Sequence, residues 1–235
     1  MTKDVIIACD FSSGAETIAF LGRFTGKKPF VKIGMELFYA EGPKIVRDIK
    51  DRGHKVFLDL KLHDIPNTVK RAMTALRDLD PDITNVHAAG GRAMMEAALE
   101  GITKPDGSRP LITAVTQLTS VNERMMKDEL LIASGLEETV IAYAKNAAKA
   151  GLDGVVCSPL EAVTIHKECG KSFLTVTPGI RFTGGDAGDQ ARITTPALAK
   201  ELGSDLIVVG RPITSAEDPV QAYNKCLKEF SGKGE

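Results

Sequence analysis

Short runs rich in valine and isoleucine recur along the whole chain, and each is followed by a longer segment with the apolar spacing of an amphipathic helix. Eight such runs occur, at residues 5–9, 30–33, 55–60, 83–87, 111–116, 154–157, 173–177 and 206–209. Buried strands have this length and this enrichment in β-branched residues, and their alternation with helical segments is typical of repeated β-α units. The pattern therefore predicts an α/β protein built on a parallel sheet.

The runs at 5–9 and 206–209 are continuously apolar, which indicates strands that are covered on both faces. Eight units in 235 residues fit a (β/α)8 TIM barrel, whose usual length is about 250 residues. An open doubly wound sheet is the alternative, although CDFSSG stands where its usual phosphate-binding G-x-G-x-x-G motif would follow the first run.

Helix signals accompany the runs, for example a start at Pro66 and a terminating Gly151, and we expect one helix for each strand. No Pro/Gly/Ser-rich linker or low-complexity tract divides the sequence. We therefore expect one domain over residues 1–235.

Charge and hydropathy exclude several classes of protein. Lysine and arginine number 30 against 31 acidic residues, so the formal net charge is -1 and the basic surplus typical of nucleic-acid binding is missing. No apolar run approaches the ~18 residues of a membrane span, and the N-terminal apolar stretch is too short for a signal peptide. We expect a cytoplasmic protein with no nucleic-acid or membrane partner. Four scattered cysteines favour reduced core thiols over a metal site.

A group of charged residues ends the third run, and the active site of a (β/α)8 barrel lies at the carboxyl ends of its strands. Asp59 and Lys61 are two residues apart, so in a regular strand both point to the barrel mouth while Leu60 points to the helices. Taken alone, an Asp-Lys pair is more often a surface ion pair. Here it ends an apolar strand, where unpaired charge is unfavourable, and that position favours an active site.

A lysine held among carboxylates, here Asp59 and Asp64 with Lys32 in the preceding run, keeps its proton. Its ammonium group can stabilise a developing carbanion in a dry pocket and then protonate it. The arrangement predicts that Lys61 is a proton donor in a decarboxylation that needs no metal and no organic cofactor.

The last two runs predict an anion-binding end of the same site. Barrels often bind phosphate through the loops after strands seven and eight, and Gly210 and Arg211 follow the eighth run. A rim arginine paired with a helix carboxylate is the alternative for Arg211. Residues 181–190 include three glycines in five positions, a composition that suits a lid and an ordinary surface loop equally well.

His87 ends the fourth run and could carry a proton, although a hydrogen-bonded histidine at the edge of the core is the commoner role. His54 is expected on the surface.

Five segments together resemble one known family along essentially the whole chain. The most specific is DLKLHDIPNT at 59–68, and KIGMEL at 32–37, VTQLTS at 115–120, TPGIR at 177–181 and VGRPIT at 209–214 match in the expected order. The sequence is similar to the orotidine 5'-phosphate decarboxylase family. The resemblance implies a homodimer that converts orotidine 5'-phosphate to UMP and carbon dioxide without a metal or cofactor.

The resemblance also implies a role for individual residues. Lys61 would donate the proton to C6 of the pyrimidine, Asp59 would lie beside the departing carboxylate, and Asp64 and Thr68 would reach the neighbouring subunit's site. The remaining implied substrate-binding residues are Asp10 and Lys32 at the ribose, Thr119 near the base, Gln190 between base and phosphate, and Pro178, Arg181, Gly210 and Arg211 toward the lid and phosphate.

The sequence is also compatible with two rival functions. A sister group on the same barrel, which includes 3-keto-gulonate 6-phosphate decarboxylase and hexulose-phosphate synthase, shares a D-x-K-x-x-D core but uses magnesium. The Ile65-Pro66-Asn67-Thr68 extension favours the pyrimidine enzyme. A catalytically silent barrel that senses a nucleotide phosphate would need Gly210 and Arg211 but not Lys61 among carboxylates.

Overall fold

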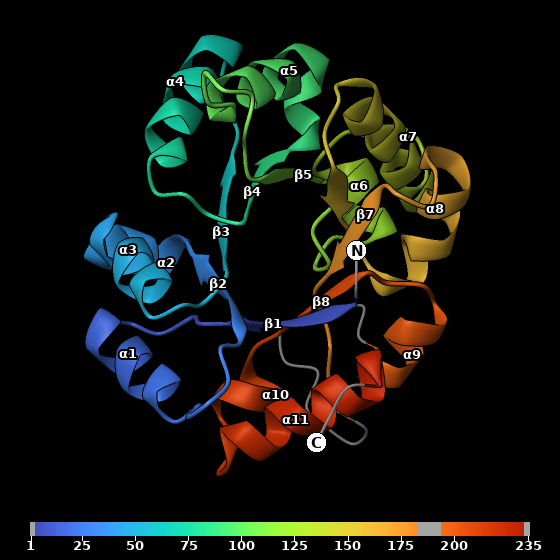
Figure 1. Cartoon of the computed structure of the whole chain (residues 1–235). Coiled ribbons are helices and arrows are strands. Elements are labelled where there is room, and N and C mark those ends of the chain that lie inside the picture. Colours follow the sequence, from blue (N-terminus) through green and yellow to red (C-terminus); the bar gives the residue numbers. More distant parts are fainter. Residues whose placement is uncertain (1–2, 183–193, 233–235) are drawn as a thin grey trace.

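Eight parallel strands form a closed barrel in the computed structural model, which describes residues 3–182 and 194–232. The strands follow the chain order around the barrel, and β8 pairs with β1 to close it (Figure 1). The prediction of a (β/α)8 barrel is confirmed, and the open-sheet alternative was wrong. The strands are β1 (Asp4–Ala8), β2 (Phe30–Gly34), β3 (Val56–Leu62), β4 (Ile83–His87), β5 (Leu111–Val115), β6 (Gly154–Val156), β7 (Leu174–Thr177) and β8 (Leu206–Val209).

Helices surround the barrel on its outside (Figure 1). The expectation of one helix for each strand was wrong, because two α-helices follow β2, two lie between β5 and β6, and two follow β8 within the described residues. The α-helices are α1 (Gly14–Gly22), α2 (Met35–Glu41), α3 (Lys44–Asp51), α4 (Pro66–Arg77), α5 (Gly91–Ile102), α6 (Glu123–Asp128), α7 (Leu136–Lys149), α8 (Ala162–Cys169), α9 (Pro196–Glu201), α10 (Arg211–Thr214) and α11 (Pro219–Ser231), with 3-10 turns η1 (Ala88–Gly90) and η2 (Pro159–Glu161).

The two faces of each strand bury their side chains in different places. One face packs against the helices in a large apolar cluster that includes Val31, Leu58 and Val86. The other face fills the barrel, where a second cluster includes Phe30 and Phe57. This double burial explains why the strands read as continuous apolar runs.

The inward face changes from apolar to polar along several strands. On β2 the inward sequence is Phe30 then Lys32, and on β3 it is Phe57 then Asp59, because successive inward positions are two residues apart. The amino-terminal half of the barrel is therefore an apolar plug, and the carboxyl-terminal half presents charged groups.

His54 does not lie on the surface as the sequence suggested. It is 4% exposed, and its Nδ1 lies 2.9 Å from the carbonyl oxygen of Pro29.

None of the helices in the described residues has the combination of length and apolar character that crossing a membrane requires.

Candidate active site

A cavity of about 640 Å³ opens at the carboxyl ends of the strands, within the usual range of small-molecule sites. It gathers residues that are far apart in the sequence, because each strand delivers its last inward residues to the same mouth. Nine of the predicted site residues line it, namely Asp10, Lys32, Asp59, Lys61, Thr119, Pro178, Arg181, Gly210 and Arg211.

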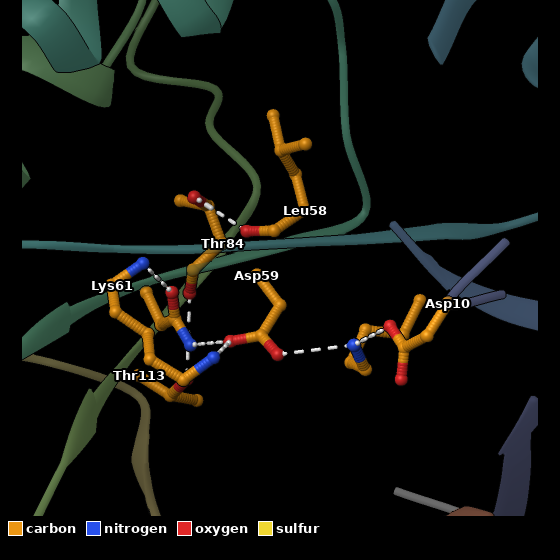
Figure 2. A network of polar contacts seen from close by, with 8 residues as sticks. Asp10, Leu58, Asp59, Lys61, Thr84 and Thr113 are labelled. Carbon is orange, nitrogen blue, oxygen red and sulfur yellow. Dashed lines mark hydrogen bonds and ion pairs between the residues drawn. The ribbon is translucent and has the colours of Figure 1, made fainter. Parts of the chain in front are cut away.

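Four charged side chains alternate in sign across one side of this cavity. Lys32 Nζ lies 2.8 Å from Asp10 Oδ1 and 3.4 Å from Asp59 Oδ2, and Lys61 Nζ lies 2.7 Å from Asp59 Oδ1. Figure 2 shows Asp59 at the centre of the row, with Lys61 on one side and Asp10 on the other. Two carboxylates and two ammonium groups thus compensate one another's charge at the barrel mouth.

The buried members of this row stay ionised because each has a partner of opposite charge. Burial alone would lower the pKa of Lys32, but attraction to Asp59 and Asp10 outweighs it and holds this pKa above its ordinary value of 10.5. Burial likewise opposes ionisation of Asp59, yet Lys32 and Lys61 hold its pKa below the ordinary 3.8. Near neutral pH the site therefore contains a carboxylate fixed between two cations.

Lys61 reaches the cavity by a route that regular strand alternation did not predict. The pairing of β3 with β4 shifts register between Leu58 and Leu62, and Lys61 has a φ of 51°, in the left-handed region. Few non-glycine residues adopt this conformation, because Cβ crowds the backbone. Leu60 is buried in the outer cluster as predicted. The strand thus delivers Asp59 by alternation and Lys61 by a local irregularity.

Two residues that contact the charged row were missed from the sequence. Asn85, inward on β4, donates from Nδ2 to Asp59 Oδ1 at 2.7 Å and accepts at Oδ1 from the Lys61 backbone N–H at 2.8 Å. A polar side chain in the middle of an apolar strand was the available signal. Gly34 has no side chain to signal its role, and a Cβ there would lie 3.0 Å from Asp10 Oδ1 and 3.1 Å from Lys32 Nζ.

The cavity is also lined by uncharged polar side chains and by two arginines. Gln117 and Thr119 follow β5 and are nearly buried. Arg181 follows β7, and its Nη1 donates to the carbonyl oxygen of Ile180 at 2.8 Å. Arg211 follows β8 and begins α10, with Gly210 at the N-cap. Two guanidinium groups from the last two β-α loops therefore face the same cavity as the charged row.

Two of the predicted residues that the structure describes, Asp64 and Thr68, do not line the cavity. Asp64 lies between β3 and α4 and Thr68 lies in the first turn of α4, and both are exposed. Asp64 Oδ1 accepts a hydrogen bond from the Ile65 backbone N–H at 2.6 Å. Lys61 is thus paired with Asp59 and not with Asp64 in this chain. Gln190 lies outside the described residues, as does most of the glycine-rich segment.

His87 also lies away from the cavity-lining set. Its ring centroid is 5.5 Å from that of His63. Burial, followed by electrostatic interaction with His63 and Lys61, lowers the pKa of His87. In the part of the chain that the structure describes, no three His, Cys, Asp or Glu side chains gather as a metal-binding group.

Comparison with known proteins identifies the same family from the whole sequence. The model of the "Orotidine 5'-phosphate decarboxylase / HUMPS family" matches residues 3–226. A protein of Geobacillus sp. (strain WCH70) named orotidine 5'-phosphate decarboxylase is 55% identical over 236 residues, which is 99% of each chain. A protein of the same name from Bacillus cytotoxicus is 55% identical over 235 residues, again 99% of each.

Solved structures agree with these sequence matches. The crystal structure of orotidine 5'-phosphate decarboxylase from Lactobacillus acidophilus is similar with a TM-score of 0.86 at 42% identity, covering 97% of this chain and 99% of that one. An uncharacterized conserved protein from Geobacillus kaustophilus also gives a TM-score of 0.86, at 52% identity over 96% of this chain and 99% of that one. From its sequence and its barrel, this chain belongs to the orotidine 5'-phosphate decarboxylase / HUMPS family.

Proposed function

We propose that this protein decarboxylates orotidine 5'-phosphate to UMP and carbon dioxide, the last step of de novo pyrimidine nucleotide synthesis. The observation that carries the proposal is the Lys61 ammonium group, held 2.7 Å from Asp59 in a cavity that Arg181 and Arg211 also line. The names of relatives that are 55% identical over the whole chain support the same reaction.

The reaction needs fixed charge more than it needs a cofactor. Loss of carbon dioxide from C6 leaves an electron pair in the plane of the pyrimidine ring, where the π system cannot delocalise it. A cation held in place before the reaction stabilises that charge without reorganising solvent. Lys61 supplies the cation and then transfers its proton to C6, which completes UMP.

The other residues of the charged row position the substrate and hold Lys61. Asp59 would lie beside the departing carboxylate, where repulsion can add ground-state strain. Asp10 and Lys32 would contact the ribose hydroxyls, since Asp10 is at the open end of the row with its side chain 56% exposed. Because Lys32 bridges both carboxylates, ribose binding and the orientation of Asp59 are coupled.

The two arginines that line the cavity would bind the phosphate. Arg211 and Arg181 offer planar forks of N–H donors that suit phosphate oxygens, and Gly210 leaves room beside them. Thr119 and Pro178 would then lie along the base and the substrate between the two ends. Gln190, proposed to bridge base and phosphate, belongs to a segment outside the described residues.

The magnesium-dependent sugar-phosphate reaction is the rival, because the name of the family model covers both groups. A divalent cation would have to share the oxygens of Asp59 with Lys32 and Lys61, which lie 3.4 Å and 2.7 Å from them. Two ammonium groups at these distances repel a further cation. The charged row therefore favours the reaction that uses the lysine itself.

We further propose that residues 1–235 form one domain, that the protein acts in the cytoplasm, and that two copies form the functional unit. The support for a dimer is the exposed segment that holds Asp64 and Thr68 immediately after the site strand. Ile65 in the same segment is 67% exposed. In a dimer this segment would be covered, and Asp64 and Thr68 would complete the neighbour's site.

The substrate assignment is tested by supplying the purified chain with orotidine 5'-phosphate or with hexulose 6-phosphate, each in EDTA and in magnesium. We expect UMP and carbon dioxide from the nucleotide in both buffers, and no conversion of the sugar phosphate. Turnover of the sugar phosphate in magnesium, with no UMP formed, would replace the proposed reaction with its rival.

A further inference from the structure

One buried amide lies behind the charged row and contacts both of its central residues. Asn85 is fully buried on the inward face of β4 and is not one of the residues that line the cavity. Its Nδ2 lies 2.7 Å from Asp59 Oδ1, and its Oδ1 lies 2.8 Å from the backbone nitrogen of Lys61. Asn85 thus has no access to a substrate, yet it holds both residues that are proposed to contact one.

The chemistry of the partners fixes the orientation of this amide. A backbone N–H can only donate, and an ionised carboxylate can only accept, so the oxygen of Asn85 must face Lys61 and its nitrogen must face Asp59. Asp59 is ionised, since Lys32 and Lys61 hold its pKa below the ordinary value. Only a neutral side chain with one donor and one acceptor satisfies both contacts.

The contact with Lys61 replaces a missing bond of the sheet. The register of β3 against β4 shifts between Leu58 and Leu62, and the backbone of Lys61 has a φ of 51°. This conformation persists only where neighbouring groups specify it. The side chain of Asn85 binds the displaced N–H, so it holds the backbone in the position from which Lys61 Nζ meets Asp59 at 2.7 Å.

We infer that Asn85 is a positioning residue for the proposed decarboxylation, which fixes the Asp59 carboxylate and the left-handed backbone of Lys61 with a single amide. This inference rests on the proposed function. Misplacement of a catalytic group by about 1 Å can cost on the order of 100-fold in rate. The phosphate end of the cavity is formed by other strands, so substrate binding should change far less than turnover.

Two variants of Asn85 and one control separate positioning from simple packing. Asn85→Leu keeps the approximate volume but loses both hydrogen bonds. Asn85→Asp keeps both bonds only while the introduced carboxyl is protonated, because its ionised form repels Asp59. The control is Thr84→Val, which changes the residue next to Asn85 on β4. It removes the buried hydrogen bond from Thr84 Oγ1 to the carbonyl oxygen of Leu58 on β3.

Steady-state kinetics with orotidine 5'-phosphate and thermal unfolding are measured for each protein. For Asn85→Leu we expect kcat to fall about 100-fold with KM within about threefold, and for Thr84→Val we expect kcat within about threefold of wild type. Burial beside Asp59 raises the pKa of the introduced carboxyl of Asn85→Asp. At lower pH more of this carboxyl is protonated and makes both hydrogen bonds. The ratio of wild-type kcat to Asn85→Asp kcat should therefore decrease by about threefold or more from pH 9 to pH 6.

Either of two results would overturn the inference. One is a folded Asn85→Leu protein whose kcat matches that of Thr84→Val, and the other is a ratio for Asn85→Asp that stays constant over the pH range. If Asn85→Leu does not fold, the pH dependence of Asn85→Asp decides alone. Failure of the proposed function is distinct, because wild type itself would then form no UMP.

Discussion

Asp59 is the residue through which the other members of the charged row are connected. It accepts from Asn85 and Lys61 at one oxygen and attracts Lys32 at the other. Breaking a buried ion pair on one side leaves uncompensated charge, which is strongly destabilising. The same contacts of Asp59 fix the position of the Lys61 ammonium group. They therefore provide both the charge compensation and the geometry of the site.

Gly34 makes this arrangement possible by lacking a side chain, and Gly34→Ala tests that role. Its Cβ would lie 3.0 Å from Asp10 Oδ1 and 3.1 Å from Lys32 Nζ. Both atoms end flexible side chains, so the free energy of unfolding should fall by only about 1 kcal/mol. The ion pair would shift, and we expect kcat/KM to fall by about tenfold or more.

Gly22→Ala is the matched control, because a Cβ at this last residue of α1 meets nothing within 4 Å. We expect unchanged kcat/KM and a stability equal to or above wild type by up to about 1 kcal/mol, from helix propensity. Steady-state kinetics and urea unfolding of both variants provide the comparison. Equal kcat/KM for Gly34→Ala and wild type would show that the close approach is unimportant.

Among the elements, the carboxyl ends of the strands form the cavity, whereas their amino-terminal ends carry contacts that stabilise the barrel. At the amino-terminal end, an aspartate just before each of three even-numbered strands binds a backbone N–H of the preceding strand. Asp82 accepts from Val56, Asp153 from Ile112, and Asp205 from Thr175, at 2.8 to 2.9 Å. Each also pairs with a basic side chain, respectively Lys50, Arg109 and His166. These contacts tie adjacent strands together far from the cavity.

Asp153→Ala should therefore affect stability without affecting catalysis. It removes two contacts with Arg109 and leaves the Ile112 N–H without its side-chain acceptor. We expect the free energy of unfolding to fall by about 2–3 kcal/mol, with kcat and KM unchanged because the site is at the opposite end. Asp128→Ala, which removes an exposed pair with Arg124 on α6, should cost less than about 1 kcal/mol. A loss of kcat in folded Asp153→Ala would contradict this division.

The strands could be predicted because their burial requires apolar residues, which form recognisable runs in the sequence. All eight strands were found because both of their faces are largely apolar, and Asp59 and Lys32 followed from their position near the ends of the predicted runs at 55–60 and 30–33. The left-handed φ of Lys61 was not predictable, since a lysine carries no signal for it and the register shift arises from pairing with β4. Asn85 was missed for the same reason, because its partners are 24 and 26 residues away in the sequence.

At the scale of the whole molecule, a dimer whose active sites each use residues of both subunits can be tested by mixing two inactive variants. If Asp64 completes the neighbour's site, Lys61→Ala and Asp64→Asn would each inactivate a homodimer. In a mixed dimer one site carries both changes and the other carries neither. After subunit exchange in an equal mixture, about a quarter of the wild-type activity should return, because half the dimers are mixed and each has one intact site.

Co-purification through two different affinity tags checks that mixed dimers have formed. Mixing Lys61→Ala with a differently tagged Lys61→Ala protein is the control and should restore nothing. Mixed dimers without recovered activity would show that Asp64 does not act across an interface.

The central claim is that Lys61 is the proton donor, and it is tested most directly by following the loss of orotidine 5'-phosphate absorbance in EDTA. Wild type, Lys61→Ala and Lys70→Ala are compared, the last being a lysine on α4 that pairs with Glu100 away from the cavity. We expect rapid conversion by wild type and Lys70→Ala, and a kcat lower by about 10⁴-fold or more in Lys61→Ala. A folded Lys61→Ala protein that retains kcat within about tenfold of wild type would contradict the claim.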